Sequence, residues 1–121
     1  KLVWHAIQDM DGGEIYVKKI PSMKVTDIAK AVDKDRDIKI IGIRPGEKLH
    51  ETMIPKEESL NCLEMKDFYI IQPMLSWWDR KKIDPNIKKY GKKVLKPFEY
   101  SSENNKVFLP VPEIKKLIKN I

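Results

Sequence analysis

Two oppositely charged residues stand three apart around a Pro-Gly turn and offer the clearest chemistry in the sequence. Arg44 precedes Pro45-Gly46, and Glu47 follows it. A guanidinium presents a planar fork of donors that matches phosphate oxygens, and a carboxylate can accept hydrogen bonds from the two neighbouring hydroxyls of a ribose. Together the pair suits a nucleoside diphosphate. The alternative is that Arg44 pairs with Glu47 or Glu51 and only fixes the turn, and the residue types alone leave both interpretations open.

The segments on either side of this pair should position it. Residues 38–43 are β-branched and almost entirely apolar, which predicts a buried strand. A helix is expected from Glu47 to about Met53, with Leu49 and Met53 on one side. A junction between strand and helix would place free backbone N–H groups and the positive end of the helix dipole beside the pair.

The rest of the chain alternates between expected helices and short strands. The patterns predict a helix over 1–10 that ends before Gly12-Gly13, followed by a strand over 14–18. A second helix is expected from an N-cap at Thr26 to about Val32, with Ile28, Ala29 and Val32 buried. The patterns further predict an irregular stretch over 54–66, a strand over 68–71, and a last helix near 112–120 with Pro112 in its first turn. Because about three short strands are few for an independent sheet, and because helical periodicity begins at Lys1 without a cap, we expect a lobe that packs on a larger domain.

Composition indicates a single soluble domain. The chain has 121 residues, of which 41% are apolar and 35% charged, so it is neither fibrous nor disordered. Its longest apolar run, residues 40–43, is too short to cross a membrane, and no signal-peptide pattern is found. The single cysteine, Cys62, excludes an internal disulfide and a site with several thiolate ligands. It fits a reducing compartment, so a cytoplasmic location is expected.

The net charge of +6 comes from one stretch. Residues 79–96 hold eight basic and two acidic residues, which accounts for the whole imbalance. With the adjacent Trp77 and Trp78, this stretch could bind phosphates, nucleic acid or an acidic partner. We favour the simpler interpretation of a solvated loop, in which the tryptophans pack in the core or at a subunit interface.

Other reactive side chains lack the partners that catalysis or metal binding requires. His50 lies near the proposed pocket, where capping or packing is a commoner role than acid–base catalysis. Cys62 has no base beside it in the sequence. The two histidines and one thiol are too widely spaced for a metal site. The sequence therefore predicts no catalytic and no metal-binding residue in this chain.

Four segments carry a resemblance to a known family. They are Gly12-Gly13-Glu14-Ile15-Tyr16-Val17, Lys19 to Asp27, Ile40 to Glu51, and Phe98-Glu99-Tyr100-Ser101-Ser102 with Asn104-Asn105. Together they resemble the C-terminal part of the UDP-N-acetylglucosamine 4,6-dehydratase (inverting) family, which are CapD-like enzymes of the extended short-chain dehydrogenase/reductase superfamily. The resemblance runs through most of the chain and is weakest over residues 75–96.

The resemblance implies an α/β fold class: a small mixed substrate-binding lobe of an extended short-chain dehydrogenase/reductase, with the Rossmann domain absent from this chain. We expect the substrate-binding lobe over residues 1–74, a basic, aromatic-flanked loop over 75–97, and a C-terminal extension with the terminal helix over 98–121. The lobe is then expected to pack on the N-terminal Rossmann domain of the same protein, and a homo-oligomer is expected.

The resemblance also implies a function. Arg44 would contact the UDP diphosphate and Glu47 the UDP ribose, while NAD(P) would bind the missing N-terminal domain. No cofactor is expected in this chain, since its glycines do not form a G-x-G-x-x-G loop. The family dehydrates a UDP-sugar for capsule, O-antigen or other surface glycans. The alternatives are a fragment of a CapD-like UDP-sugar 4-epimerase and, in a different class, a small basic nucleic-acid-binding module, although neither nucleic acid nor a membrane is the expected partner.

Overall fold

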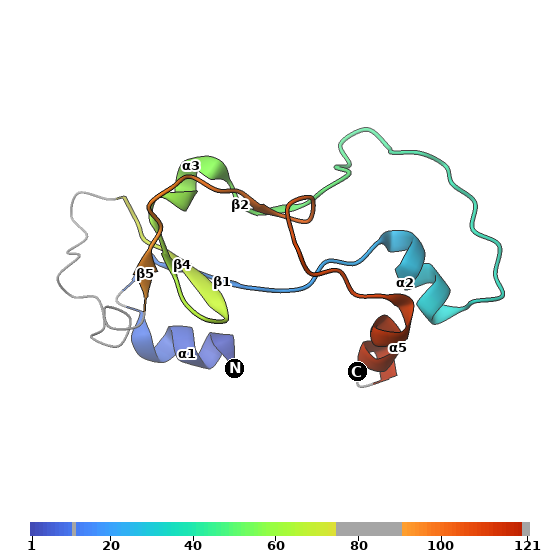
Figure 1. The fold of residues 1–121 in the computed structure, drawn as a ribbon, viewed down its shortest axis with the longest axis horizontal. Coiled ribbons are helices and arrows are strands. Elements are labelled where there is room, and N and C mark those ends of the chain that lie inside the picture. The colour runs from blue at the N-terminus through green and yellow to red at the C-terminus, as the bar shows by residue number, and fades with distance from the viewer. Residues whose placement is uncertain (11, 75–90, 120–121) are drawn as a thin grey trace. The chain divides into compact units, whose positions relative to one another are not determined.

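The computed structural model describes residues 1–10, 12–74 and 91–119. They fall into two compact units, each built from two separate stretches of chain (Figure 1). Unit 1 comprises Lys1–Lys19 and Thr52–Tyr100, and unit 2 comprises Ile20–Glu51 and Ser101–Ile121. The expected division into 1–74, 75–97 and 98–121 stays a prediction. Trp77, Trp78 and the basic residues from Arg80 to Lys89 lie outside the described residues.

Unit 1 contains a four-stranded antiparallel sheet. Its strands are β1 (Ile15–Lys18), β4 (Phe68–Ile71), β3 (Cys62–Glu64) and β5 (Lys92–Lys93), in the order β1-β4-β3-β5. In the inner strand β4, Ile70 pairs with Tyr16 of β1 on one side and with Leu63 of β3 on the other. The strands expected over 14–18 and 68–71 are therefore confirmed.

The two faces of this sheet are covered differently. On one face Val17, Ile54, Cys62 and Ile71 form a buried cluster, against which Tyr69, Val94, Phe98 and Tyr100 pack. On the other face lies α1 (Leu2–Asp9), where the predicted N-terminal helix is confirmed. The ring of His5 lies 5.1 Å from the ring of Phe68 and 6.3 Å from that of Tyr16. Alternate side chains of the strands thus meet two separate apolar environments.

The stretch over 54–66, which was expected to be irregular, is ordered. β2 (Thr52–Ile54) leads into α3 (Lys56–Ser59), and β3 follows. The buried hydroxyl of Ser59 donates to the Lys56 carbonyl at 2.6 Å and accepts from the Phe98 amide at 3.1 Å. A second sheet of two strands pairs β2 with β6 (Tyr100–Ser101). The expectation failed partly because β2 pairs with β6 and β3 pairs with β5, which lie far away in the sequence.

Unit 2 is built around two helices that contact each other, α2 (Val25–Val32) and α5 (Val111–Lys119). Both helices were predicted. Lys24, not Thr26, is the N-cap of α2, and no side chain caps this end. The predicted buried stripe is also wrong, since Ile28, Ala29 and Val32 are exposed and Ala31 is the buried residue. The helix buries the face on which Ala31 lies, and α5 contributes the buried Ile114.

Hydrogen bonds between distant segments complete unit 2. The Asn105 side-chain amide donates to the Ile20 carbonyl at 2.8 Å and to the Ser22 hydroxyl at 2.9 Å, while its oxygen accepts from the Val107 amide at 3.0 Å. The Ser22 amide donates to the Val107 carbonyl at 2.8 Å. One asparagine therefore holds together two stretches that are more than eighty residues apart.

The connection between α2 and β2 differs most from expectation. Residues 38–43 are not a strand but an irregular, solvent-exposed segment, because no described residue offers them a strand to pair with. Gly42, at a φ of +82°, also interrupts a strand conformation. The helix expected from Glu47 to Met53 is absent as well: the chain forms a turn and then enters β2 at Thr52. Among the described residues, no helix is long and apolar enough to cross a membrane.

Candidate functional site

The sequence Arg44-Pro45-Gly46-Glu47 forms a tight turn. The Glu47 amide donates to the Arg44 carbonyl at 3.0 Å, which closes the turn. Gly46 has a φ of +86°, the left-handed conformation that the third residue of a type II turn requires, and Pro45 suits the position before it. In return the Arg44 amide donates to Oε2 of Glu47 at 3.0 Å. The turn thus brings the two charged residues together.

Their side chains form an ion pair. Nε of Arg44 donates to Oε1 of Glu47 at 2.7 Å, and Nη2 lies 2.5 Å from the same oxygen. The Arg44 side chain, followed by its backbone amide, lowers the pKa of the Glu47 carboxyl from its ordinary value. Both side chains are exposed, Arg44 by 75% and Glu47 by 42%. Of the two interpretations left open by the sequence, the structure shows the ion pair, and the role of the pair in binding UDP stays a prediction.

The setting of this pair corrects part of the argument from sequence. No helix begins at Glu47, so neither a helix dipole nor a row of free helical N–H groups can contribute here. The donors of the proposed pair are those of the exposed Arg44 guanidinium. An anion bound by this pair would therefore depend on the Arg44 side chain.

The segment after the turn is anchored by Ser102 in the C-terminal stretch of unit 2. The Ser102 hydroxyl accepts from the Glu51 amide at 3.1 Å and lies 3.2 Å from Nδ1 of His50, while the Ser102 amide donates to the Glu51 carbonyl at 2.8 Å. His50 thus makes a structural contact with Ser102. In the sequence, Ser102 stood out only as part of a segment that resembles the family. Its contact with Glu51 was not predicted, because no sequence pattern links residues that are 51 positions apart.

The cysteine of the chain is placed as a core residue. Cys62 is 1% exposed, and its thiol lies 3.5 Å from the Glu58 carbonyl. Burial, assisted by the negative charge of Glu58, raises the pKa of the thiol from 9.0 to about 11. Since the thiolate is the nucleophile, Cys62 is unreactive at neutral pH. Within the described part of the chain, no three His, Cys, Asp or Glu side chains gather as a metal site.

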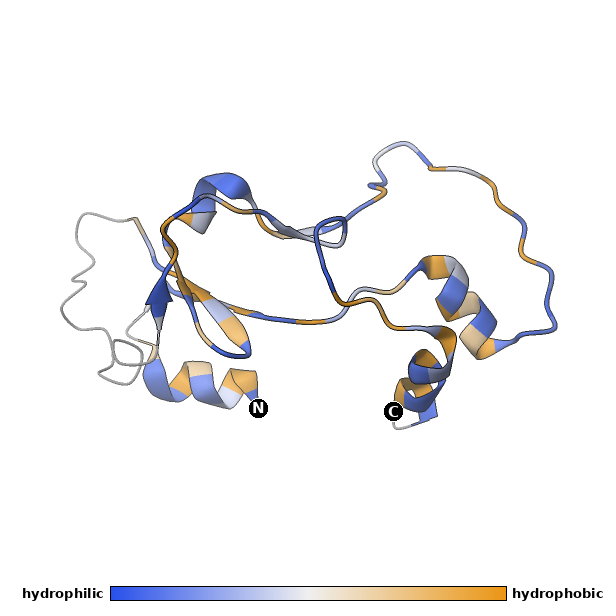
Figure 2. Ribbon diagram, in the orientation of Figure 1, coloured by the Kyte–Doolittle hydropathy of each residue, from blue (hydrophilic) through white to orange (hydrophobic). Residues whose placement is uncertain are grey.

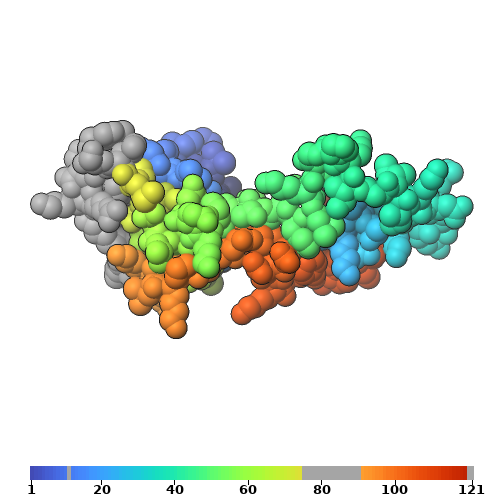
Figure 3. All heavy atoms as spheres, turned by 90° about the horizontal axis from the view of Figure 1, so that it is seen from above, coloured from blue at the N-terminus to red at the C-terminus, as the bar shows by residue number. Residues whose placement is uncertain are grey.

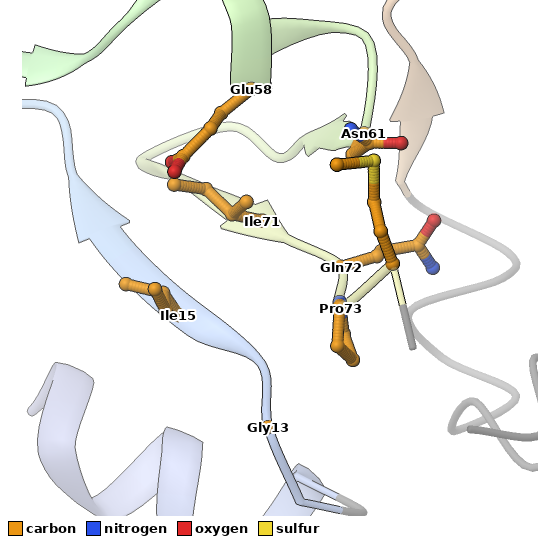
Figure 4. A pocket seen from close by; sticks show the side chains of 8 residues that line it. Gly13, Ile15, Glu58, Asn61, Ile71, Gln72 and Pro73 are labelled. Carbon is orange, nitrogen blue, oxygen red and sulfur yellow. The ribbon is translucent and has the colours of Figure 1, made fainter. Parts of the chain in front are cut away.

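Among the described residues, unit 1 contains a smaller and a larger hollow, and neither is lined by residues of the Arg44–Glu47 turn. The smaller, about 160 Å³, lies between β1 and the end of β4 and is lined mainly by apolar groups, including Ile15, Ile71 and Pro73 (Figure 4). The larger, about 570 Å³, includes His5, Phe68 and Lys19. The Lys19 ammonium already donates to Glu64 at 2.7 Å and to the Met65 carbonyl at 2.8 Å. Neither hollow contains a predicted site residue.

The chain is similar to a known protein family and to known proteins. A family model described as "Polysaccharide biosynthesis protein" matches residues 1–73. A UDP-N-acetylglucosamine 4,6-dehydratase (inverting) of Campylobacter jejuni subsp. jejuni serotype O:2 is 41% identical over 121 residues, covering 98% of this chain and 36% of that protein. A UDP-glucose 4-epimerase of Rickettsia massiliae is 34% identical over 125 residues, covering 97% and 34%.

A solved structure shares the fold. The X-ray structure of Pen from Bacillus thuringiensis superposes with a TM-score of 0.73 at 26% sequence identity, covering 98% of this chain and 35% of that one. The expected fold class, a small mixed α/β part of a larger short-chain dehydrogenase/reductase, is confirmed. The chain spans about a third of the length of the relatives it matches. On the match over residues 1–73 and the identity along nearly its whole length, the chain belongs to the polysaccharide biosynthesis protein family.

Proposed function

We propose that this chain is the UDP-sugar-binding portion of an NAD(P)-dependent UDP-N-acetylglucosamine 4,6-dehydratase (inverting) that supplies surface polysaccharide or glycan synthesis. The observation that carries the proposal is the 41% identity, over 98% of the chain, to a protein of that name. The chemistry would take place on a Rossmann domain outside this chain, which would also hold NAD(P) and act in the cytoplasm. A fragment of a UDP-sugar 4-epimerase is the second candidate, favoured by relatives named UDP-glucose 4-epimerase, such as that of Rickettsia massiliae at 34% identity.

In this proposal the Arg44–Glu47 turn holds the nucleotide. Phosphate and carboxylate oxygens fit the same guanidinium fork, so a diphosphate competes with Glu47 for Arg44. When Arg44 turns to the phosphates, the Glu47 carboxylate becomes available to the ribose hydroxyls. The exposure of both side chains leaves room for this exchange. The Ser102 contacts would keep the segment after the turn in place meanwhile.

The test is the affinity of the intact protein for UDP, measured by calorimetry. Arg44→Ala should weaken binding by roughly 1.5–3 kcal/mol, or about 10- to 150-fold, because it removes charge-assisted hydrogen bonds. Lys48→Ala is the matched control, since it removes an exposed positive charge next to the turn and should leave the affinity nearly unchanged. An unchanged affinity in the Arg44 variant would refute the site.

Two further assays separate the alternative functions. Incubation with UDP-N-acetylglucosamine followed by mass spectrometry distinguishes a dehydratase, whose product has lost one water, from an epimerase, whose product keeps the substrate's mass. A nucleic-acid-binding module would instead show steep salt dependence in a DNA-binding assay, lost when Lys88, Lys89, Lys92 and Lys93 are neutralised.

A further inference from the structure

Residues 38–43 have the composition of a strand but no strand partner. Ile38, Ile40, Ile41 and Ile43 are 41%, 77%, 75% and 59% exposed. In Figure 2 the segment that follows α2 carries hydrophobic residues along a chain drawn as neither helix nor strand, and in Figure 3 its atoms, coloured teal to green, lie at the surface. Four exposed isoleucines within six residues mark a surface that another element normally covers.

The backbone of this segment, like its side chains, lacks partners among the described residues. No backbone–backbone hydrogen bond joins residues 38–43 to another residue that the structure describes. A β-branched segment with free N–H and C=O groups is a template for strand addition. The backbone groups and the isoleucines therefore favour the same kind of partner, the edge of a sheet with an apolar face.

We propose that residues 38–43 pair as an edge strand with a strand of the longer protein that lies outside this chain. This rests on the proposed function, in which the chain is one part of a larger enzyme. The Campylobacter relative is only 36% covered by this chain, so most of such a polypeptide is available to provide the partner. A strand in the same polypeptide also pairs at a high effective concentration, which favours it over a second copy.

Strand pairing would act directly on the nucleotide site. Ile43 is followed at once by Arg44, whose amide and carbonyl belong to the closed turn with Glu47. Side-chain directions along a strand alternate from residue to residue, so fixing residues 38–43 sets the direction in which Arg44 leaves the strand. Docking of this segment therefore orients the guanidinium before UDP arrives, and disturbing it should weaken UDP binding without removing any group that touches UDP.

A pair of proline variants gives the sharpest test. Along an edge strand, successive N–H groups point alternately toward the partner strand and away from it. Ile40 and Ile41 are neighbours with almost equal exposure, so Ile40→Pro and Ile41→Pro remove the same side chain but opposite N–H groups. Hydrogen exchange is measured over residues 38–43 in the intact protein without UDP and, as a control, in the 121-residue chain.

The proposal expects residues 38–43 to exchange on the order of 100-fold more slowly in the intact protein than in the 121-residue chain. One proline variant should abolish most of this protection, and the other should keep it. Equal exchange in the two proteins would overturn the proposal. So would equal effects of the two prolines, which indicate packing without pairing, or protection that is lost on dilution together with a dimer, which indicates a second copy.

Calorimetric titration of the same intact protein with UDP keeps the two proposals apart. Protection of residues 38–43 in a protein that does not bind UDP supports the strand and refutes the proposed function. UDP binding by a protein in which these residues are unprotected refutes the strand alone.

Discussion

The strand β4 and the segment of residues 38–43 have much the same composition and opposite fates. Both are short, rich in isoleucine and predicted to be strands. Phe68–Ile71 becomes an inner strand of a sheet, with Ile70 1% exposed between β1 and β3. Residues 38–43 remain irregular, with Ile40 77% exposed. A strand preference is a fit to neighbouring strands, and of these two segments only β4 finds such neighbours among the described residues.

The largest effect that would sharpen this comparison is a matched pair of truncations in the 121-residue chain. Ile70→Ala should lower the free energy of unfolding by about 2–5 kcal/mol, because it leaves a cavity in a packed core. Ile40→Ala should change it by less than about 0.5 kcal/mol, as expected for an exposed side chain. Urea denaturation followed by circular dichroism measures both, and similar effects of the two variants would show that residues 38–43 are packed.

A smaller effect should come from Cys62, which pairs with Ile71 of β4. Because burial raises the pKa of its thiol to about 11, the unfolded chain releases this proton at lower pH than the folded chain. The contribution of the protonated, buried thiol to the free energy of unfolding is therefore complete below about pH 9, and it is lost as the pH rises toward 11. We expect a loss of about 1–2 kcal/mol over this range.

Denaturation of Cys62→Ala at the same pH values isolates the thiol. The variant should lose less stability between pH 9 and 11 than the unchanged chain. It should keep a residual slope, since burial, assisted by Glu64, also raises the pKa of the neighbouring Tyr69. An identical pH dependence in both proteins would show that the thiol is not buried as described.

The smallest effect concerns the exposed turn after residues 38–43. Because Arg44 lowers the pKa of Glu47, this carboxylate stabilises the fold above its ordinary pKa, and the contribution is lost as the pH falls through the lowered value. In Arg44→Ala the Glu47 pKa should return toward its ordinary value, as followed by NMR titration. High salt should have the same effect in the unchanged chain, since the pair is exposed. A pKa insensitive to both changes would refute the ion pair.

The sequence predicted the elements that depend on local patterns. The helices at both ends, α2, and the strands β1 and β4 follow from periodicity and were confirmed. The short elements β2, α3, β3, β5 and β6 were missed. The residues Lys92–Lys93, for instance, carry no strand pattern and become β5 only by pairing with Leu63 and Glu64.

The candidate site could be predicted only in part. The turn around Pro45-Gly46 and the proximity of Arg44 to Glu47 follow from neighbouring residues. The helix predicted after the turn is absent, because Thr52–Ile54 pairs with β6 as a strand. The spacing of Leu49 and Met53, on which the helix was predicted, does not reveal this pairing. The Ser102 anchor joins residues too far apart in sequence for any spacing rule.

The Asn105 bridge has a consequence for the order in which the protein can be built. Its partners, the Ile20 carbonyl and the Ser22 hydroxyl, leave the ribosome more than eighty residues before Asn105 does. Ala31 and Ile114, buried on the two helices of unit 2, are separated in the same way. During translation the early half of unit 2 must therefore wait, with its apolar groups uncovered, until the last stretch of chain emerges. A nascent chain halted before Asn105 should be a preferred client of chaperones.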